Sequence, residues 1–121
     1  MKNKKNIITQ EYLEQIPLRK ESIGWKTDEN GVVTLEVENK GWANRLAQVF
    51  FKRPKISYIH LDKMGSFIWP LLEGNLSIKE IGVLVEKEFG KDAHPLYERL
   101  ARYFQIMNSY GFVDWIKTQK K

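Results

Sequence analysis

The chain has 121 residues, of which 42% are hydrophobic and 12% aromatic, with a formal net charge of +5 and no cysteine. This length and composition suit one domain with a real core. The absence of cysteine excludes disulfides, thiolate metal sites and cysteine nucleophiles, and fits a reducing, cytoplasmic compartment. No run of about 18 apolar residues occurs, so no membrane span is expected.

The two ends of the chain are polar and rich in lysine. Residues 1–20 predict a flexible N-terminal arm, with a short helical turn around Tyr12. This arm lacks the apolar stretch of a signal peptide. Residues 21–116 are expected to form a single domain, and residues 117–121 a basic tail. The net positive charge predicts only a weak attraction to acidic partners.

The first strong local signal is the pair Asn30-Gly31, which lies between two segments of strand character. Asn-Gly is the preferred pair for a two-residue type I′ turn, because both positions need positive φ. After this pair, apolar and polar residues alternate over 33–38, which predicts a half-buried strand. Its hairpin partner is expected over 23–29.

Residues 41–51 predict a short amphipathic helix, because Trp42, Leu46, Val49 and Phe50 recur at helical spacing. The basic segment 52–54, which ends in proline, closes this helix. Residues 55–61 then predict a third strand. The face with Trp42, Leu46 and Phe50 is a candidate docking surface for a partner enzyme, and the alternative is that it covers the sheet.

Two helices are predicted next. The first begins at Asp62 as N-cap and ends at Gly74, with Pro70 expected to kink it or to end its regular part early. The second begins with a capping box, in which Ser77 and Glu80 satisfy each other's backbone N–H groups, and it ends at 89–90.

A third helix is predicted from Pro95, a residue favoured at the first helical position, to Tyr110. Gly111 suits the left-handed position after the helix, and Phe112 can then fold back onto the last turn. Residues 112–116 are compatible with a terminal strand. The predicted fold class is α+β and winged-helix-like, with a small three-stranded antiparallel sheet, a three-helix bundle and an extra short helix between the second and third strands.

An ordered set of short motifs resembles the PqqD family. The motifs are Leu61-Asp62-Lys63-Met64-Gly65-Ser66-Phe67-Ile68-Trp69, Leu72-Glu73-Gly74, Ser77-Ile78-Lys79-Glu80-Ile81 and Ser109-Tyr110-Gly111-Phe112-Val113. The resemblance covers about residues 56–113. It implies a scaffold without catalytic activity or cofactor, which binds the leader of a ribosomally made precursor peptide. Members of the family present that leader to a modifying enzyme, often a radical SAM enzyme.

The resemblance also implies where the peptide binds. It would add as an extra strand along residues 55–61, in a groove between this strand and the third helix. Edge-strand addition depends mainly on backbone groups, so its sequence signature is faint. The predicted peptide-binding residues are Lys55, Ile56, Ser57, Tyr58, Ile59, His60, Arg99, Tyr103, Ile106 and Tyr110.

The third helix supplies an observation that is independent of the resemblance. On a helical wheel its apolar arc spans roughly 220°, about twice a normal core stripe. The arc contains Leu96, Tyr97, Leu100, Ala101, Tyr103, Phe104, Ile106, Met107 and Tyr110. Such a surplus can bury both a core and a groove, although a small domain that surrounds the helix on three sides would need it too. Arg99 and Arg102 border the arc, where they either meet acidic peptide side chains or are only solvated.

Signals of catalysis are weak. The histidines His60 and His94 have no companions at metal-ligand spacing. His60 and Asp62 lie on one side of the predicted strand, as a base and its orienting acid would, but one such pair is weak evidence and we expect a plain surface or sheet histidine. No phosphate-binding glycine loop or nucleophile motif occurs. We therefore expect no catalytic residue and no metal site.

Two other functions fit the same pattern. A winged-helix DNA-binding protein agrees with the three helices and the positive charge, but the third helix lacks a basic recognition face, so we expect no nucleic-acid partner. A structural interaction subunit would bind a folded protein through the Trp42 face. The peptide ligand, the partner enzyme and the oligomeric state stay open.

Overall fold

The structure is a computed structural model that describes residues 9–39 and 55–116. The chain divides into two compact units. One contains the described residues of 21–66, and the other contains those of 1–20 and 67–121. The predicted helix over 41–51, with Trp42, Leu46 and Phe50, lies outside the described residues, as do residues 1–8 and the predicted tail over 117–121. The predicted domain division stays a prediction.

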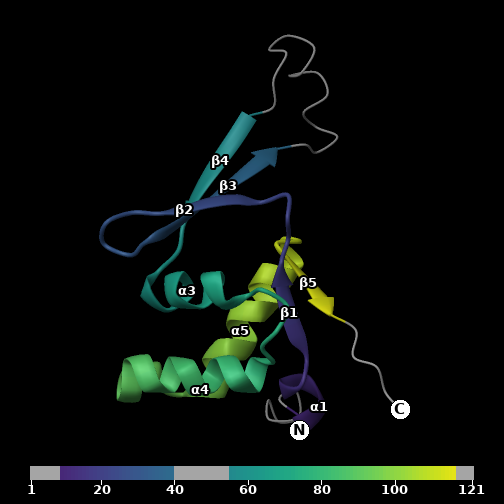
Figure 1. The fold of residues 1–121 in the computed structure, drawn as a ribbon, viewed down its shortest axis with the longest axis vertical. Coiled ribbons are helices and arrows are strands. Elements are labelled where there is room, and N and C mark those ends of the chain that lie inside the picture. Colours follow the sequence, from purple (N-terminus) through teal and green to yellow (C-terminus); the bar gives the residue numbers. More distant parts are fainter. Residues whose placement is uncertain (1–8, 40–54, 117–121) are drawn as a thin grey trace, which may run out of the picture. The chain divides into compact units, whose positions relative to one another are not determined.

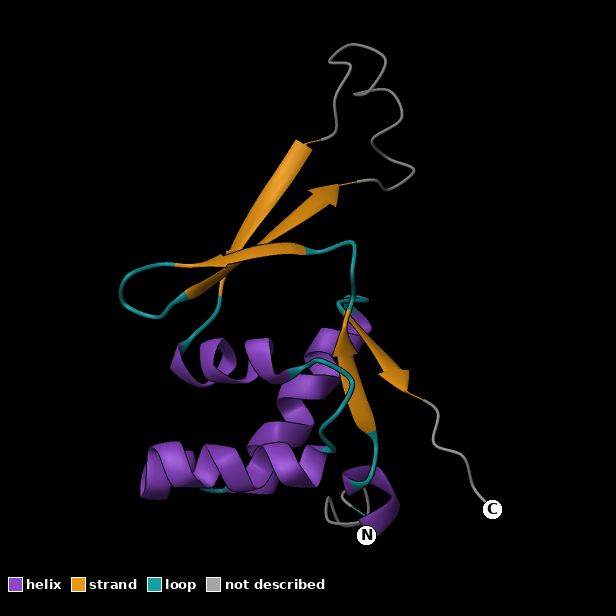
Figure 2. Ribbon diagram, viewed as in Figure 1, coloured by secondary structure: helices purple, strands orange, loops and turns teal. Residues whose placement is uncertain are grey.

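The unit of residues 21–66 contains an antiparallel sheet, which has three strands among the described residues (Figures 1 and 2). They are β2 (Gly24–Thr27), β3 (Val33–Asn39) and β4 (Lys55–His60), in the order β2-β3-β4. Val33 and Leu35 are fully buried, whereas Thr34 and Glu36, which alternate with them, are only partly so. The alternation along β3 and the α+β class with a three-stranded antiparallel sheet are thus confirmed. The winged-helix assignment stays a prediction.

The hairpin turn between β2 and β3 differs from the prediction. The Gly31 N–H donates to the Asp28 carbonyl at 3.0 Å, so Glu29 and Asn30 are the central residues of the turn. Gly31, with φ of 83°, follows as the left-handed residue of a bulge. The Asp28 carboxylate accepts the N–H groups of Asn30 and Val32 at 2.8 and 2.9 Å. This aspartate closes the loop, which moves the turn one residue upstream of a two-residue Asn-Gly turn.

Helix α3 (Lys63–Ile68) begins as predicted, because the Asp62 Oδ1 accepts the Gly65 N–H at 2.7 Å. The buried Ser66 hydroxyl accepts the Val33 N–H at 2.8 Å and donates to the Leu61 carbonyl at 3.2 Å. After Ile68 the chain tightens into the 3₁₀ turn η3 (Trp69–Leu71), which contains Pro70. The early end of the regular helix at Pro70 is therefore confirmed.

The second unit is built around α4 (Ile78–Phe89) and α5 (Leu96–Ser109), joined by η4 (Gly90–Ala93). The capping box of α4 is confirmed, with Ser77 N–H to Glu80 Oε1 at 2.8 Å and Glu80 N–H to Ser77 Oγ at 3.1 Å. Pro95 is the N-cap of α5 rather than its first helical residue, so the helix begins one residue later than predicted, at Leu96. The core of this unit includes the fully buried Trp69, Leu72, Ile78, Ile81, Val85 and Leu100.

The end of α5 forms the predicted glycine cap. Gly111 has φ of 76°, its N–H donates to the Asn108 carbonyl at 3.0 Å, and the Phe112 N–H donates to the Met107 carbonyl at 2.9 Å. These two bonds are those of a Schellman motif. Phe112 is buried and its ring stacks on Tyr110. This cap redirects the chain into β5 (Val113–Ile116), the strand expected after the third helix.

The prediction of a flexible arm is wrong for residues 9–20. They form α1 (Gln10–Leu13), where a helical turn was expected, and the unpredicted strand β1 (Ile16–Arg19). β1 pairs with β5 in a separate two-stranded sheet, from Ile16 opposite Ile116 to Arg19 opposite Val113. Pro17 is fully buried, and the Arg19 N–H donates to the Leu72 carbonyl at 2.9 Å. This segment therefore belongs to the folded unit.

Candidate functional site

The edge of the three-stranded sheet at β4 is the first candidate site. β4 is an outer strand, and no strand among residues 9–39 and 55–116 pairs along its other side. The Leu61 N–H donates to the Val33 carbonyl at 2.9 Å, so these two residues form a hydrogen-bonded pair at the end of the β3–β4 ladder. Because bonded and non-bonded pairs alternate in antiparallel sheets, the backbone groups of Ile56, Tyr58 and His60 point away from β3.

The side chains of the same three residues share one face of the sheet. Tyr58 is 60% exposed and Ile56 is 43% exposed, and His60 is also exposed. Ser57 and Ile59, on the other face, are only partly exposed. Exposed apolar rings and chains beside an outer strand are unusual unless something covers them, since natural proteins protect such edges. The edge therefore combines outward backbone groups with apolar contact area.

His60 does not pair with Asp62 as a catalytic base would. Its Nδ1 lies 2.7 Å from Thr34 Oγ1 on the neighbouring strand, while Asp62 caps α3. The hypothesis of a base and its orienter is therefore wrong, and His60 is a cross-strand sheet histidine. Among the described residues, no group of three or more His, Cys, Asp or Glu side chains is placed to hold a metal ion.

The residues predicted on the third helix differ in their surroundings. Tyr110 is 69% exposed and Ile106 is 45% exposed, whereas Tyr103 is half-buried and packs edge-on against Phe104. The Arg99 guanidinium donates to the Asp92 backbone carbonyl, so it joins the start of α5 to η4. Leu100, Phe104 and Met107 are buried. The broad apolar arc thus does more than fill the core.

The two predicted walls of the peptide groove belong to different units, since β4 lies in residues 21–66 and α5 in the other unit. Within each unit, the predicted residues cluster on one element and several are exposed. A shared groove between strand and helix stays a prediction.

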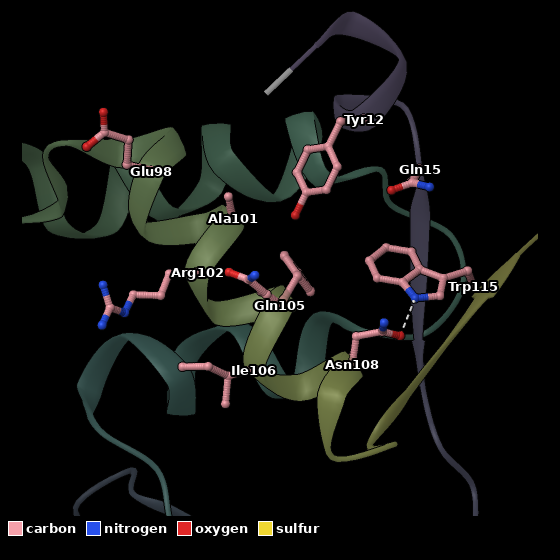
Figure 3. A pocket seen from close by; sticks show the side chains of 10 residues that line it. Tyr12, Gln15, Glu98, Ala101, Arg102, Gln105, Ile106, Asn108 and Trp115 are labelled. Carbon is pink, nitrogen blue, oxygen red and sulfur yellow. Dashed lines mark hydrogen bonds between the residues drawn. The ribbon is translucent and has the colours of Figure 1, made fainter. Parts of the chain in front are cut away.

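A second candidate site was not predicted from the sequence. A pocket of about 780 Å³ lies within the helical unit, along α5 and between α1 and β5 (Figure 3). Tyr12 and Gln15 line it from the N-terminal segment, Trp115 from β5, and Ala101, Gln105 and Asn108 from α5. These residues are far apart in the sequence, and the pairing of β1 with β5 places the N-terminal segment beside the strand that carries Trp115.

The architecture defines a small α+β protein that combines an outer strand with exposed apolar side chains and a helical unit. The chain belongs to the PqqD family: the family profile described as "Coenzyme PQQ synthesis protein D (PqqD)" matches residues 32–113. This confirms the resemblance and associates the family with synthesis of the coenzyme PQQ. No curated protein and no solved structure matches the chain. Within the described residues, no helix has the length and apolarity needed to cross a membrane.

Proposed function

We propose that the chain is a non-catalytic peptide-binding module that recognises the leader of a ribosomally synthesised precursor peptide. The leader adds to the outer edge of β4 as a further antiparallel or parallel strand. The module then presents the peptide to a modifying enzyme of the radical SAM type. The observation that supports this proposal most is the outer edge of β4, with its exposed Tyr58 and Ile56, inside the region that matches the family.

Backbone pairing alone is a weak source of affinity. Each backbone hydrogen bond between β4 and the peptide contributes only about 0.5–1.5 kcal/mol net, because water bonds to the same groups before binding. Side-chain contacts must therefore add to the ladder, and Ile56 and Tyr58 supply apolar area next to the edge. The exposed residues of α5, Ile106 and Tyr110, are proposed as the second wall.

Proline substitution tests the edge without changing the core. Tyr58→Pro removes an outward N–H, and proline is tolerated at such positions of outer strands. Thr27→Pro is the matched control, since Thr27 lies on β2, the opposite edge, with its backbone N–H also pointing outward by the same alternation. Both variants should keep the fold, as judged by circular dichroism and melting temperature.

The probe is a 12-residue peptide selected from a randomised display library on the full chain, titrated into ¹⁵N-labelled protein. We expect amide shifts over residues 55–61 that are lost in Tyr58→Pro and kept in Thr27→Pro. Equal binding by both variants, or shifts confined to other elements, would contradict strand addition at β4. A short precursor peptide encoded next to a radical SAM enzyme in the same gene neighbourhood would support the proposed partner.

A further inference from the structure

The pocket along α5 has a rigid apolar floor. Phe104 is only 1% exposed, and its ring centroid lies 5.8 Å from that of Trp115. The Trp115 indole N–H donates to Asn108 Oδ1 at 3.0 Å, which joins β5 to the last turns of α5 (Figure 3). Trp115 is also opposite the buried Pro17 in the β1–β5 pair. The floor is thus fixed before any ligand arrives, which lowers the entropic cost of binding.

The polar groups around this floor are mostly neutral. In the described part of the chain, the side-chain amides of Gln15 and Gln105 have no hydrogen-bond partner, and neither has the half-buried Tyr12 hydroxyl. Burial raises the pKa of Tyr12, so this hydroxyl remains a neutral donor at physiological pH. The Asn108 Oδ1 accepts the Trp115 indole N–H, so the Asn108 NH₂ group is left to donate a hydrogen bond to a ligand.

The charges that line the pocket offset each other. Glu98 and Arg102 are the charged lining residues, one acidic and one basic, and both lie on α5. A phosphate or nucleic-acid ligand would need an excess of positive charge, which this site lacks. Carboxamides donate and accept at once, as peptide groups do, so the polar set matches a polypeptide backbone better than an ion.

Three of the ten residues that line the pocket lie outside the part of the chain that defines the family. Tyr12, Gln15 and Trp115 all lie beyond the matched residues 32–113. The pocket is also contained in the helical unit, whereas β4 belongs to the other unit. It is therefore a site separate from the β4 edge itself, and of its lining residues Ile106 is the one that is also proposed to contact the leader.

We propose that this pocket binds an uncharged peptide segment of a partner protein through one aromatic or large aliphatic side chain. The side chain occupies the floor formed by Ala101, Phe104 and Trp115, and the carboxamides of Gln15 and Gln105 bond to the flanking peptide groups. A volume of about 780 Å³ lies in the range of pockets that hold drug-sized ligands, and leaves room for only a few residues. The chain would then hold two polypeptides at once, one along the β4 edge and one in this pocket.

The experiment uses three capped tripeptides as probes: N-acetyl-Ala-Phe-Ala-amide and its analogues with Asp or Lys in place of both alanines. Each is titrated into the full ¹⁵N-labelled chain, and the indole N–H of Trp115 and the side-chain amides of Gln15 and Gln105 are followed. The neutral peptide should shift these signals saturably. Each charged analogue should bind at least about tenfold more weakly than the neutral peptide.

Substitutions assign the response to the pocket. Ala101→Trp fills the floor and should abolish the shifts, while Gln105→Ala, at an exposed position that does not threaten folding, should weaken binding by about fivefold through the loss of hydrogen bonds to the peptide. Gln10→Ala is the matched control, because Gln10 is an exposed glutamine that does not line the pocket. Tyr58→Pro should leave the shifts unchanged, so failure here is distinguishable from failure of strand addition at β4.

Several results would overturn the proposal. Binding that Ala101→Trp and Gln105→Ala both leave intact would place the peptide elsewhere, and the absence of any shift would mean that the pocket takes no peptide. Equal binding of phenol would identify a site for small aromatic molecules. Pocket signals that move when the protein alone is diluted would identify a second copy of the chain as the occupant.

Discussion

The β4 edge and the α5 pocket offer a ligand two different kinds of surface. At the edge, the backbone of Ile56, Tyr58 and His60 provides the hydrogen-bonding groups, and the exposed side chains of Ile56 and Tyr58 add apolar contact area. In the pocket, side chains such as Gln105 and Trp115 provide both the polar groups and the floor. The comparison teaches that proline should be the damaging substitution at the β4 edge, whereas alanine or a bulky residue should be the damaging substitution in the α5 pocket.

The largest expected effect concerns the core beneath the pocket. Phe104→Ala removes a buried ring from α5 and should lower the free energy of unfolding by about 3–5 kcal/mol. Val83→Ala, at a position on α4 that is 58% exposed, should change it by less than about 0.5 kcal/mol. Urea unfolding followed by tryptophan fluorescence measures both. Similar small losses for the two variants would mean that Phe104 does not support the pocket floor.

The next effect separates backbone from side chain at β4. Tyr58→Pro should reduce the affinity for an edge-binding peptide by about tenfold or more, since it removes an outward N–H and alters the strand next to it. Tyr58→Ala keeps the N–H and loses only contact area, so it should reduce affinity less. Isothermal titration with the selected peptide gives the two values. An alanine variant that binds as poorly as the proline variant would show that the ring, rather than the ladder, binds the peptide.

The capping box of α4 gives an effect of about 1 kcal/mol. Ser77→Ala removes the acceptor for the Glu80 N–H and should lower the free energy of unfolding by about that amount. Ser77→Asp should restore most of it, because aspartate is also a good N-cap. Thermal unfolding measures both variants. Neither substitution should change peptide binding at β4, which lies in the other unit.

The smallest effect is a pH dependence from Tyr12. Burial raises its pKa above the ordinary value of 10.0, so the folded chain holds this proton more tightly than the unfolded chain. The resulting stability is fully present below pH 10 and is lost as pH rises through the folded-state pKa. Tyr12→Phe should remove the contribution of this residue to the loss of stability at alkaline pH. The difference in phenolate absorbance between the parent and Tyr12→Phe reports the pKa, and a value at or below 10 would contradict burial in the pocket.

Local rules predicted the helix boundaries well. The Asp62 cap, the Ser77–Glu80 box, the interruption at Pro70 and the Gly111 cap each depend on residues within a few positions of one another. The hairpin turn was misplaced by one residue because Asp28, outside the Asn-Gly pair, supplies the side-chain bonds that close the loop. Even there the error has a local cause.

Features that depend on distant pairing were not predictable. β1 has four residues and contains Pro17, so its pattern alone does not indicate a strand, and its partner β5 lies about a hundred residues later in the sequence. The pocket follows from this pairing, since it joins Tyr12 to Trp115. The β4 edge was predicted as a strand from its sequence. Its place as a peptide site came from the family resemblance, because strand addition leaves little trace in side chains.

Hydrogen exchange at the outward-pointing amides of β4 tests the central claim most directly. In the chain alone, the N–H groups of Ile56, Tyr58 and His60 should exchange quickly, because none of them bonds to β3. When the selected peptide is added at saturation, all three should slow markedly, with the Trp115 indole N–H unaffected. Unchanged exchange at these three amides, with the peptide bound, would contradict strand addition at this edge.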